Sequence, residues 1–148
     1  MLGADAVQDY LLEKIPLARQ MEARVITCDD TGVRLAAPLA PNINHRGTVF
    51  GGSASAVAML CGWALVHARI ADLPFDTGLV IRRQQMEFDH PIDGDFQAWC
   101  AMPEREVLQR FDTDLADQGK SRVELAVQLH VGERCAATFT GVYVALKS

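Results

Sequence analysis

One stretch of the chain, from Gly47 to Ala68, contains no Asp, Glu, Lys or Arg. Its second part, Ser53–Ala68, reads SASAVAMLCGWALVHA and is rich in alanine and other strong helix formers. A helix that is apolar on nearly every face must be buried on nearly every side. In a chain of 148 residues, only a sheet that curves around the helix can bury it in this way. The residues before it, Gly47–Gly52, are expected to form a glycine-rich turn.

The same stretch is long enough in principle to cross a membrane. However, glycines, serines, a threonine and a histidine interrupt it. We therefore expect a buried core helix and no contact with a membrane. The N-terminal residues, MLGADAVQDY, carry early acids and no basic segment, which does not fit a signal peptide.

Alternating apolar and polar residues on both sides of this helix predict an antiparallel sheet. The expected strands are Arg24–Cys28, Val33–Ala37, Gly78–His90, Asp95–Met102, Val123–Val131 and Glu133–Leu146. Turn-forming residues predict that these strands form three successive pairs, the first with the second, the third with the fourth and the fifth with the sixth. Two more helices are expected at Asp5–Lys14, which Pro16 ends, and at Pro103–Ala116, which Gly119 ends. The chain is therefore predicted to be one α+β domain over residues 1–148.

Charge and cysteine content argue against several classes of function. The chain has 14 Lys and Arg against 19 Asp and Glu, a net charge of −5, whereas a nucleic-acid binder needs a basic surface. A few local arginines would still suffice for a small anionic ligand. The cysteines and histidines show no metal-ligand spacing, which predicts no metal site. Four scattered cysteines are typical of reduced residues in a cytoplasmic protein.

The segment Asn44–Gly52, NHRGTVFGG, resembles the loop and helix start of hotdog-fold acyl-thioester hydrolases. Their pattern there is N-x-x-G-T-x-H-G-G, followed by an acid on the helix. Phe88–Pro91, with Gly94–Asp95 after it, resembles the aromatic-x-x-P…G-D strand end of these enzymes. More narrowly, PNINHRGTVFGGS and DYLLEKIPLA resemble the thioesterase family of the YiiD type, as does the inserted helix before Gly119. That family also occurs as the C-terminal half of a bacterial fusion with an acetyltransferase domain.

The resemblance implies a hotdog fold, in which a long antiparallel sheet wraps around a central helix. It implies a homodimer, or a tetramer, with sites formed between subunits. The implied activity is hydrolysis of an acyl-CoA or acyl-carrier-protein thioester. No cofactor is implied, because coenzyme A or phosphopantetheine would enter as part of the substrate.

Two elements of the motif suit this chemistry. Gly51 or Gly52, at the start of the helix, would offer a backbone N–H group and the positive end of the helix dipole to an oxyanion. The glycines could equally serve only a tight turn. Asn44 matches the family residue that holds the water or the substrate carbonyl, although Asn42 and Asn44 are also common turn formers.

Three positions depart from the family pattern. Phe50 stands where the family has a histidine, and Met59 stands where it has a carboxylate on the helix. The position of a strand hydroxyl falls near Ile81. A base must therefore come from elsewhere or be absent. The candidate bases are His45, which adjoins Asn44, and Glu87 and Asp89 on the flanking strand.

Further residues are expected to contact the substrate. They are Asn42, Arg46, Thr48, Phe50, Ser53, Met59, Arg82 and Glu87. Arg46 and one of Arg82 and Arg83 would bind phosphates, since adjacent strand residues point to opposite faces. The apolar helix residues Val57, Met59, Leu60 and Trp63 would line either an acyl tunnel or the plain core. Cys61, deep in the apolar helix, is expected to be an inert thiol.

Two other functions remain open at this point. Phe50 and Met59 favour a non-catalytic protein that binds acyl thioesters or lipids. A dehydratase acting on a hydroxyacyl thioester would need a histidine and an acid facing each other across the site. No such pair is evident in the sequence.

Overall fold

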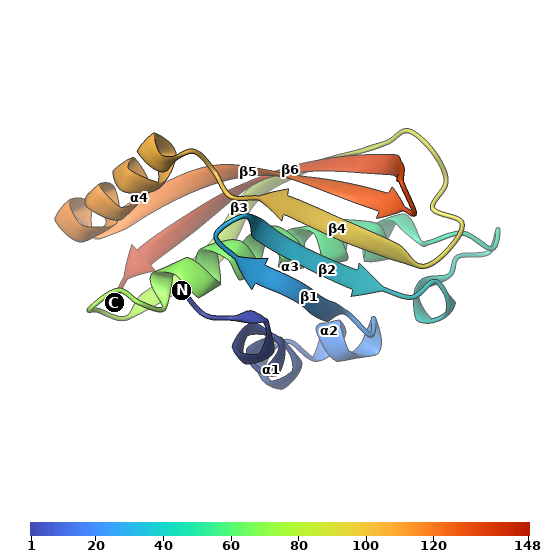
Figure 1. Ribbon diagram of the computed structural model, residues 1–148, viewed down its shortest axis with the longest axis horizontal. Helices are drawn as coiled ribbons and strands as arrows, with labels where there is room; N and C mark the ends of the chain where they lie inside the picture. The colour runs from blue at the N-terminus through green and yellow to red at the C-terminus, as the bar shows by residue number, and fades with distance from the viewer.

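A curved antiparallel sheet of six strands wraps around one long helix (Figure 1). The computed structural model describes all residues, 1–148. The helices are α1 (Ala4–Lys14), α2 (Pro16–Gln20), α3 (Gly51–Ile70) and α4 (Arg105–Gln118), and Ala40–Asn42 form a short 3-10 turn, η1. The strands are β1 (Arg24–Asp29), β2 (Gly32–Ala37), β3 (Thr77–Phe88), β4 (Phe96–Ala101), β5 (Lys120–Val131) and β6 (Arg134–Lys147). This arrangement confirms the predicted α+β class.

The order of the strands differs from the prediction in one place. The sheet runs β1-β2-β4-β5-β6-β3, so β3 pairs with β6 at one edge while β4 lies between β2 and β5. The predicted pairing of Gly78–His90 with Asp95–Met102 is therefore wrong. Neighbouring strands in sequence often pair, but here the connection between them crosses from an edge of the sheet to its middle. The other two predicted hairpins, β1 with β2 and β5 with β6, are confirmed.

The central helix α3 explains the charge-free stretch of the sequence. It is long and apolar enough to cross a membrane by length and composition, yet 61% of its most apolar window is buried inside the protein. Its buried residues belong to one core cluster of 34 residues, shared with the inner face of the sheet. The burial of α3 on most of its sides therefore explains its apolar composition, and no membrane is needed to explain it. The helix starts at Gly51, inside the predicted turn, because its first positions need no intrahelical N–H bond and tolerate glycine.

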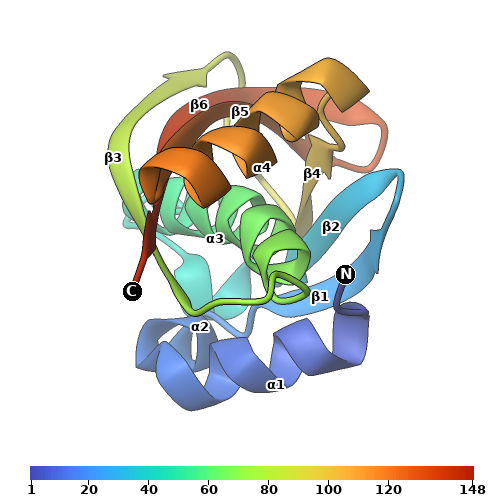
Figure 2. The same ribbon diagram turned by 90° about the vertical axis from the view of Figure 1, so that its left-hand side faces the viewer.

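The remaining helices lie on two sides of α3 (Figure 2). Helix α4 lies beside α3 on the inner face of the sheet, where Phe111 is buried and Asp112 forms an ion pair with Arg69 of α3, with 2.6 Å between oxygen and nitrogen. Helix α1 covers the side of α3 that the sheet leaves open, and it buries Val7 and Leu11 there. Ile15 and Pro16 separate α1 from α2, as the proline predicts.

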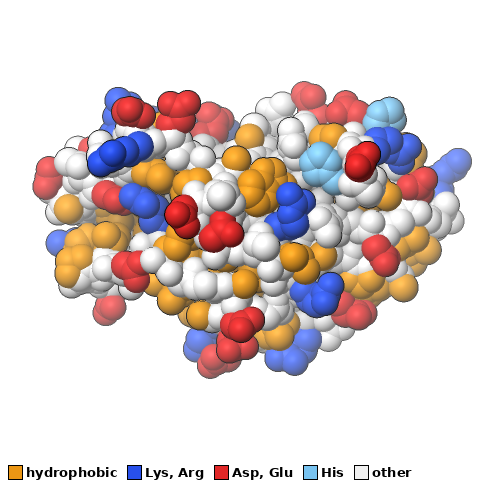
Figure 3. Space-filling model, viewed as in Figure 1, with side chains coloured by type: hydrophobic (Ala, Val, Ile, Leu, Met, Phe, Trp, Pro, Cys, Tyr) orange, Lys and Arg blue, Asp and Glu red, His pale blue; other side chains and the backbone are white.

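Acidic and basic side chains alternate over the face seen in Figure 3, with no broad area of one sign. This mixture agrees with a modest net charge of −5. It gives that face no extended field that would attract a polyanion.

Candidate functional site

A cleft of about 340 Å³ lies where the N-terminus of α3 meets the end of β3. We call it the helix-end cleft. Its eight lining residues are Thr48, Val49, Gly51, Phe88, Asp89, His90, Pro91 and Ile92. They come from two segments that the sequence motif singled out, the loop before α3 and the strand end after β3. The fold therefore brings both halves of the motif to one place.

The start of α3 presents unpaired backbone donors at this cleft. Phe50 precedes the helix, and its carbonyl accepts a hydrogen bond from the N–H of Ala54 at 3.1 Å. No side chain caps the helix, and the N–H groups of Gly51 and Gly52 have no partner within the protein. These donors and the positive end of the helix dipole suit a negatively charged oxygen.

Two exposed phenyl rings flank these donors. The ring of Phe88 lies so that a Cβ atom on Gly51 would meet its Cζ at 3.5 Å. The ring of Phe50 lies over Gly52, where any Cβ would collide with it. Phe50 is 58% exposed and Phe88 is 52% exposed, so both rings present apolar surface to solvent beside these donors. Glycine at position 52 is thus what allows the ring of Phe50 to lie against the helix backbone, whereas position 51 would accept a Cβ in ordinary contact with Phe88.

Asn44 organises the turn that leads to the cleft. Its Oδ1 accepts hydrogen bonds from the N–H groups of Arg46 and Thr48, at 2.8 and 3.1 Å. Its Nδ2 donates to the hydroxyl of Thr48 at 2.9 Å and to the carbonyl of Val49 at 3.4 Å. The amide is therefore fully engaged within its own loop, as a turn-forming asparagine would be. It places Thr48, which lines the cleft.

The other predicted residues of this loop lie outside the cleft. His45 and Arg46 are exposed at the tip of the turn. Asn42 is 2% exposed, and its Nδ2 donates to the carbonyls of Met21 and Pro38. These contacts give Asn42 a packing role beneath the loop.

On β3, alternation and a bulge decide which side chains reach the site. Phe88 points toward α3, so its neighbour Glu87 points to the opposite side and is exposed. Asp89 follows the strand and lines the cleft. The register of β3 against β6 shifts between Ile81 and Arg83. Simple alternation therefore does not hold at Arg82 and Arg83, and both side chains are exposed.

The predicted residues further along α3 divide between its two faces. Val57, Leu60 and Cys61 are buried in the core, and burial raises the pKa of the Cys61 thiol well above its usual range. This confirms an inert thiol. Met59, Trp63 and Ser53 are half-buried. Near them the Ser55 hydroxyl donates to Oε1 of Gln84 on β3 at 2.9 Å.

One lining residue, His90, escaped the sequence-based selection. It stands at the end of the predicted strand Gly78–His90, and it does not adjoin Asn44 as His45 does. The resemblance of Phe88–Pro91 to the family's strand end was the signal that could have found it. No group of three or more His, Cys, Asp or Glu side chains is arranged to hold a metal ion.

One family of known proteins matches nearly the whole chain. The family model described as "Putative thioesterase (yiiD_Cterm)" matches residues 4–147. The chain belongs to this family. The match spans almost the whole chain, including the helix-end cleft and every element of the sheet.

Solved structures agree with membership of the yiiD_Cterm family. A protein of unknown function from Chlorobaculum tepidum is 25% identical, with a TM-score of 0.92 over 98% of this chain and 94% of that one. A putative thioesterase from Shewanella oneidensis is 26% identical, with a TM-score of 0.85 over 97% and 96%. PA5026 of Pseudomonas aeruginosa, titled a probable thioesterase, is 23% identical with a TM-score of 0.83 over 99% and 97%, and shows the fold alone. The chain thus has the hotdog fold of thioesterases.

Proposed function

We propose that this chain hydrolyses an acyl-CoA or acyl-carrier-protein thioester. The observation that carries the proposal is the set of unpaired N–H groups at Gly51 and Gly52, which stand at the head of a 20-residue helix beside a cleft. Membership of a thioesterase family supports the same chemistry.

In the proposed reaction, the thioester carbonyl oxygen lies at the start of α3. A water molecule attacks the carbonyl carbon, and the oxygen gains negative charge. The N–H groups of Gly51 and Gly52 bind that charge more strongly than they bind the neutral carbonyl, which lowers the barrier. Asn44 contributes by holding the turn and the Thr48 hydroxyl at the edge of the cleft. Phe50 and Phe88 are the apolar surfaces that the acyl group would contact first.

The rest of the substrate would extend over the neighbouring surface. Arg46 and Arg82 are exposed and form no ion pair within the protein, so both are available to phosphate groups of coenzyme A or phosphopantetheine. Ser53 and Met59 continue the half-buried face of α3 along which an acyl chain would lie. The proposal includes a homodimer and a cytoplasmic location, the latter supported by four unpaired cysteines.

Replacing Gly51 by proline tests whether its backbone N–H group is needed for hydrolysis. Proline removes the N–H group and is well tolerated at the first position of a helix. Phe50 already has φ −58° and ψ 131°, a conformation that a following proline permits. We expect Gly51→Pro to lower kcat by about a hundredfold or more. The measurement is thiol release from a panel of short, long and aromatic acyl-CoAs.

Gly51→Ala is the matched control, because it keeps the N–H group and its Cβ would meet Phe88 at an ordinary 3.5 Å. Gly52→Pro, made together with Phe50→Ala to give it room, tests the second donor against Phe50→Ala alone. Equal activity in each proline variant and its control would remove the helix N-terminus from the mechanism.

A second candidate is a non-catalytic protein that binds acyl thioesters. The observation that favours it is the complete absence of a carboxylate along α3. The resemblance aligns Met59 of this helix with the family's acidic position. Acyl-CoA binding measured by calorimetry, with no thiol release from either acyl-CoA or acyl-carrier-protein substrates, would establish this alternative.

A further inference from the structure

Hydrolysis at the helix-end cleft needs a group that takes a proton from the attacking water, and the only residue of α3 that lines the cleft is Gly51. Among the eight lining residues of the cleft, only Asp89 and His90 carry titratable side chains. They follow β3 directly and share the cleft with Gly51, the first of the proposed oxyanion donors. The cleft therefore holds its own candidate for the base.

The other titratable groups nearby lie in positions that exclude them as the base. His45 is exposed at the tip of the turn and does not line the cleft. Glu87 points to the side of β3 opposite Phe88. The Cys61 thiol is buried in the core, with its pKa raised by desolvation.

The backbone that carries His90 is fixed on both sides. The N–H groups of Asp89 and His90 both donate to the carbonyl of Ala136 on β6, at 2.9 and 3.0 Å. The N–H of Val49, in the loop before α3, donates to the carbonyl of Ile92 at 2.8 Å. These bonds tie the segment at once to the sheet and to the loop that leads into the helix.

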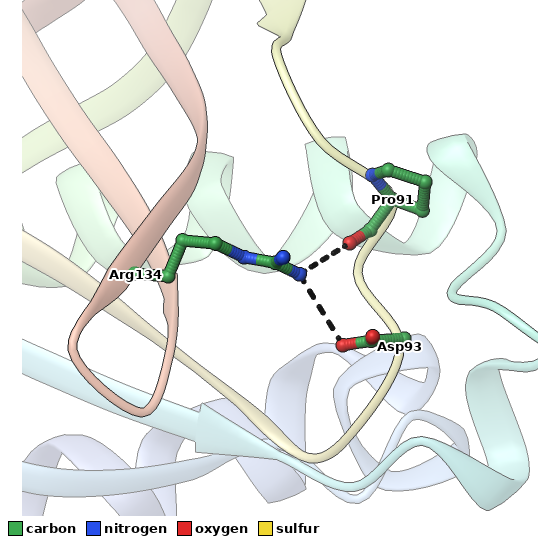
Figure 4. A network of polar contacts seen from close by, with 3 residues as sticks. All are labelled: Pro91, Asp93 and Arg134. Atoms are coloured by element: carbon green, nitrogen blue, oxygen red, sulfur yellow. Dashed lines mark hydrogen bonds and ion pairs between the residues drawn. The ribbon is translucent and has the colours of Figure 1, made fainter.

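A side chain from β6 completes this attachment (Figure 4). Arg134 donates through Nη2 to the carbonyl of Pro91 at 3.3 Å, and the same nitrogen lies 3.4 Å from a carboxylate oxygen of Asp93. Arg134 is thus a positioning residue for the segment after His90. A base held on a fixed backbone at a constant distance from the oxyanion donors is what hydrolysis requires.

We propose that His90 is the general base of this site, an inference that rests on the proposed thioesterase function. Its neutral imidazole takes a proton from water as the water oxygen forms a bond to the thioester carbonyl carbon. The carbonyl π electrons move to oxygen, and the N–H groups at Gly51 and Gly52 hold the resulting oxyanion. When the carbonyl re-forms, the carbon–sulfur bond breaks and the imidazolium returns the proton to the sulfur. The products are a carboxylic acid and a thiol.

The surroundings of His90 bring few other charges to the cleft. Asp89 adjoins it on the same segment, and Arg134 of β6 is engaged with Asp93. Residues 48–52, which form the facing wall, carry no charge. A protonated imidazole can no longer accept a proton from water, so activity should fall on the acid side of the pH profile.

The test compares histidine variants in thiol release and in the pH profile of kcat/KM. We expect His90→Gln to lower kcat by about a hundredfold or more, to leave KM nearly unchanged and to abolish the acid limb of the profile. Added imidazole should restore part of the activity of His90→Ala, which a purely structural role would not allow. His130→Gln, on β5 and outside the cleft, is the matched control and should behave as wild type.

Three results would overturn the assignment. An acid limb that persists in His90→Gln would show that another group titrates. Loss of activity in Asp89→Asn or His45→Gln, with His90→Gln active, would move the base to that residue. A wild-type protein that is inactive on every thioester would remove the proposed function and this inference together, whereas an active enzyme with a dispensable His90 removes only the inference.

Discussion

Gly62, in the middle of α3, lies directly beneath a buried tyrosine of the sheet. The hydroxyl of Tyr143 donates to the carbonyl of Met59 at 2.6 Å. A Cβ on Gly62 would lie 2.5 Å from that hydroxyl oxygen and 2.9 Å from the ring. Because Tyr143 is completely buried, the ring has little room to move away.

We therefore expect Gly62→Ala to lower the free energy of unfolding by about 1–3 kcal/mol through overpacking. Urea unfolding monitored by circular dichroism measures the loss. Gly78→Ala is the matched control, because the nearest heavy atom to its Cβ would be 3.9 Å away. A Gly62→Ala protein as stable as Gly78→Ala would mean that α3 and β6 can separate without cost.

Arg46 permits a test of how the substrate is held. The side chain is exposed at the tip of the turn and has no ion-pair partner. If it binds a phosphate of coenzyme A, Arg46→Ala should raise KM for an acyl-CoA by about fivefold, since exposed ion pairs contribute modestly. KM for the matching acyl-pantetheine, which lacks the nucleotide, should not change. Arg105→Ala, on α4, serves as the control, and an equal rise for both substrates would contradict the assignment.

At the residue scale, the sequence predicted where a residue lies when the local backbone decides its position. It did not predict the position of a residue that contacts between distant segments hold in place. The Gly51–Gly52 pair lies at the helix start because a motif fixes the local backbone. His90 was missed because its position in the cleft depends on Ala136 and Arg134, which lie far along the chain. No local pattern reports that kind of contact.

Among the elements, α1 and α3 meet through a stack of three aromatic rings. The ring of His67 is 4.5 Å from Trp63 and 4.3 Å from Tyr10, measured between centroids. Its Nε2 atom is buried without a hydrogen-bond partner, and burial lowers the pKa of His67 below its usual value of 6.5. These three rings line a second cleft, separate from the helix-end cleft, and Asp76 lines it as well.

This lowered pKa makes the α1–α3 contact sensitive to acid. The unfolded chain protonates His67 at a higher pH than the folded protein does, so stability is full above the unfolded pKa and is lost as pH falls below it. We expect the free energy of unfolding to drop between about pH 7.5 and about pH 5.5, and to drop less in His67→Gln. Urea unfolding at the two pH values tests this. His130→Gln should keep the wild-type difference, and an unchanged difference in His67→Gln would refute the explanation.

The sequence predicted elements better than it predicted their neighbours. Periodicity located every main helix and strand within a few residues, since it reflects which side of each element is buried. The predicted pairing of β3 with β4 was wrong, because β3 lies at the far edge of a sheet that curves around α3. The bulge near Arg82 was not predicted either, because no local sequence pattern indicates an extra residue in an edge strand.

For the whole molecule, β3 leaves a long sheet edge open. This 12-residue strand pairs only with β6, and an unpaired edge invites pairing with another chain. We expect light scattering after gel filtration to give about twice the chain mass of 16.2 kDa. Val80→Lys, on β3, should weaken the dimer. Val107→Lys, an exposed valine on α4, should not, and a monomer at every concentration of wild type would contradict the expectation.

The overall architecture was accessible from the sequence because one observation constrained it. A helix without charged residues, in a chain of this length, needs a sheet on nearly all sides, and only a few folds provide that. The detailed shape of the helix-end cleft was not accessible, because it depends on how far the sheet curls and on where the segment after β3 is held.

The attachment of that segment also sets when the site can exist during synthesis. Both walls of the cleft lie within residues 48–92, yet the groups that hold one wall in place, Ala136 and Arg134, leave the ribosome more than 40 residues later. Because the chain emerges from its N-terminus onward, a nascent polypeptide carries the whole motif without a formed site. Binding of an acyl ligand would therefore wait until β6 has been added, and a product truncated before β6 would carry the motif without the bonds from Ala136 and Arg134 that hold it in place.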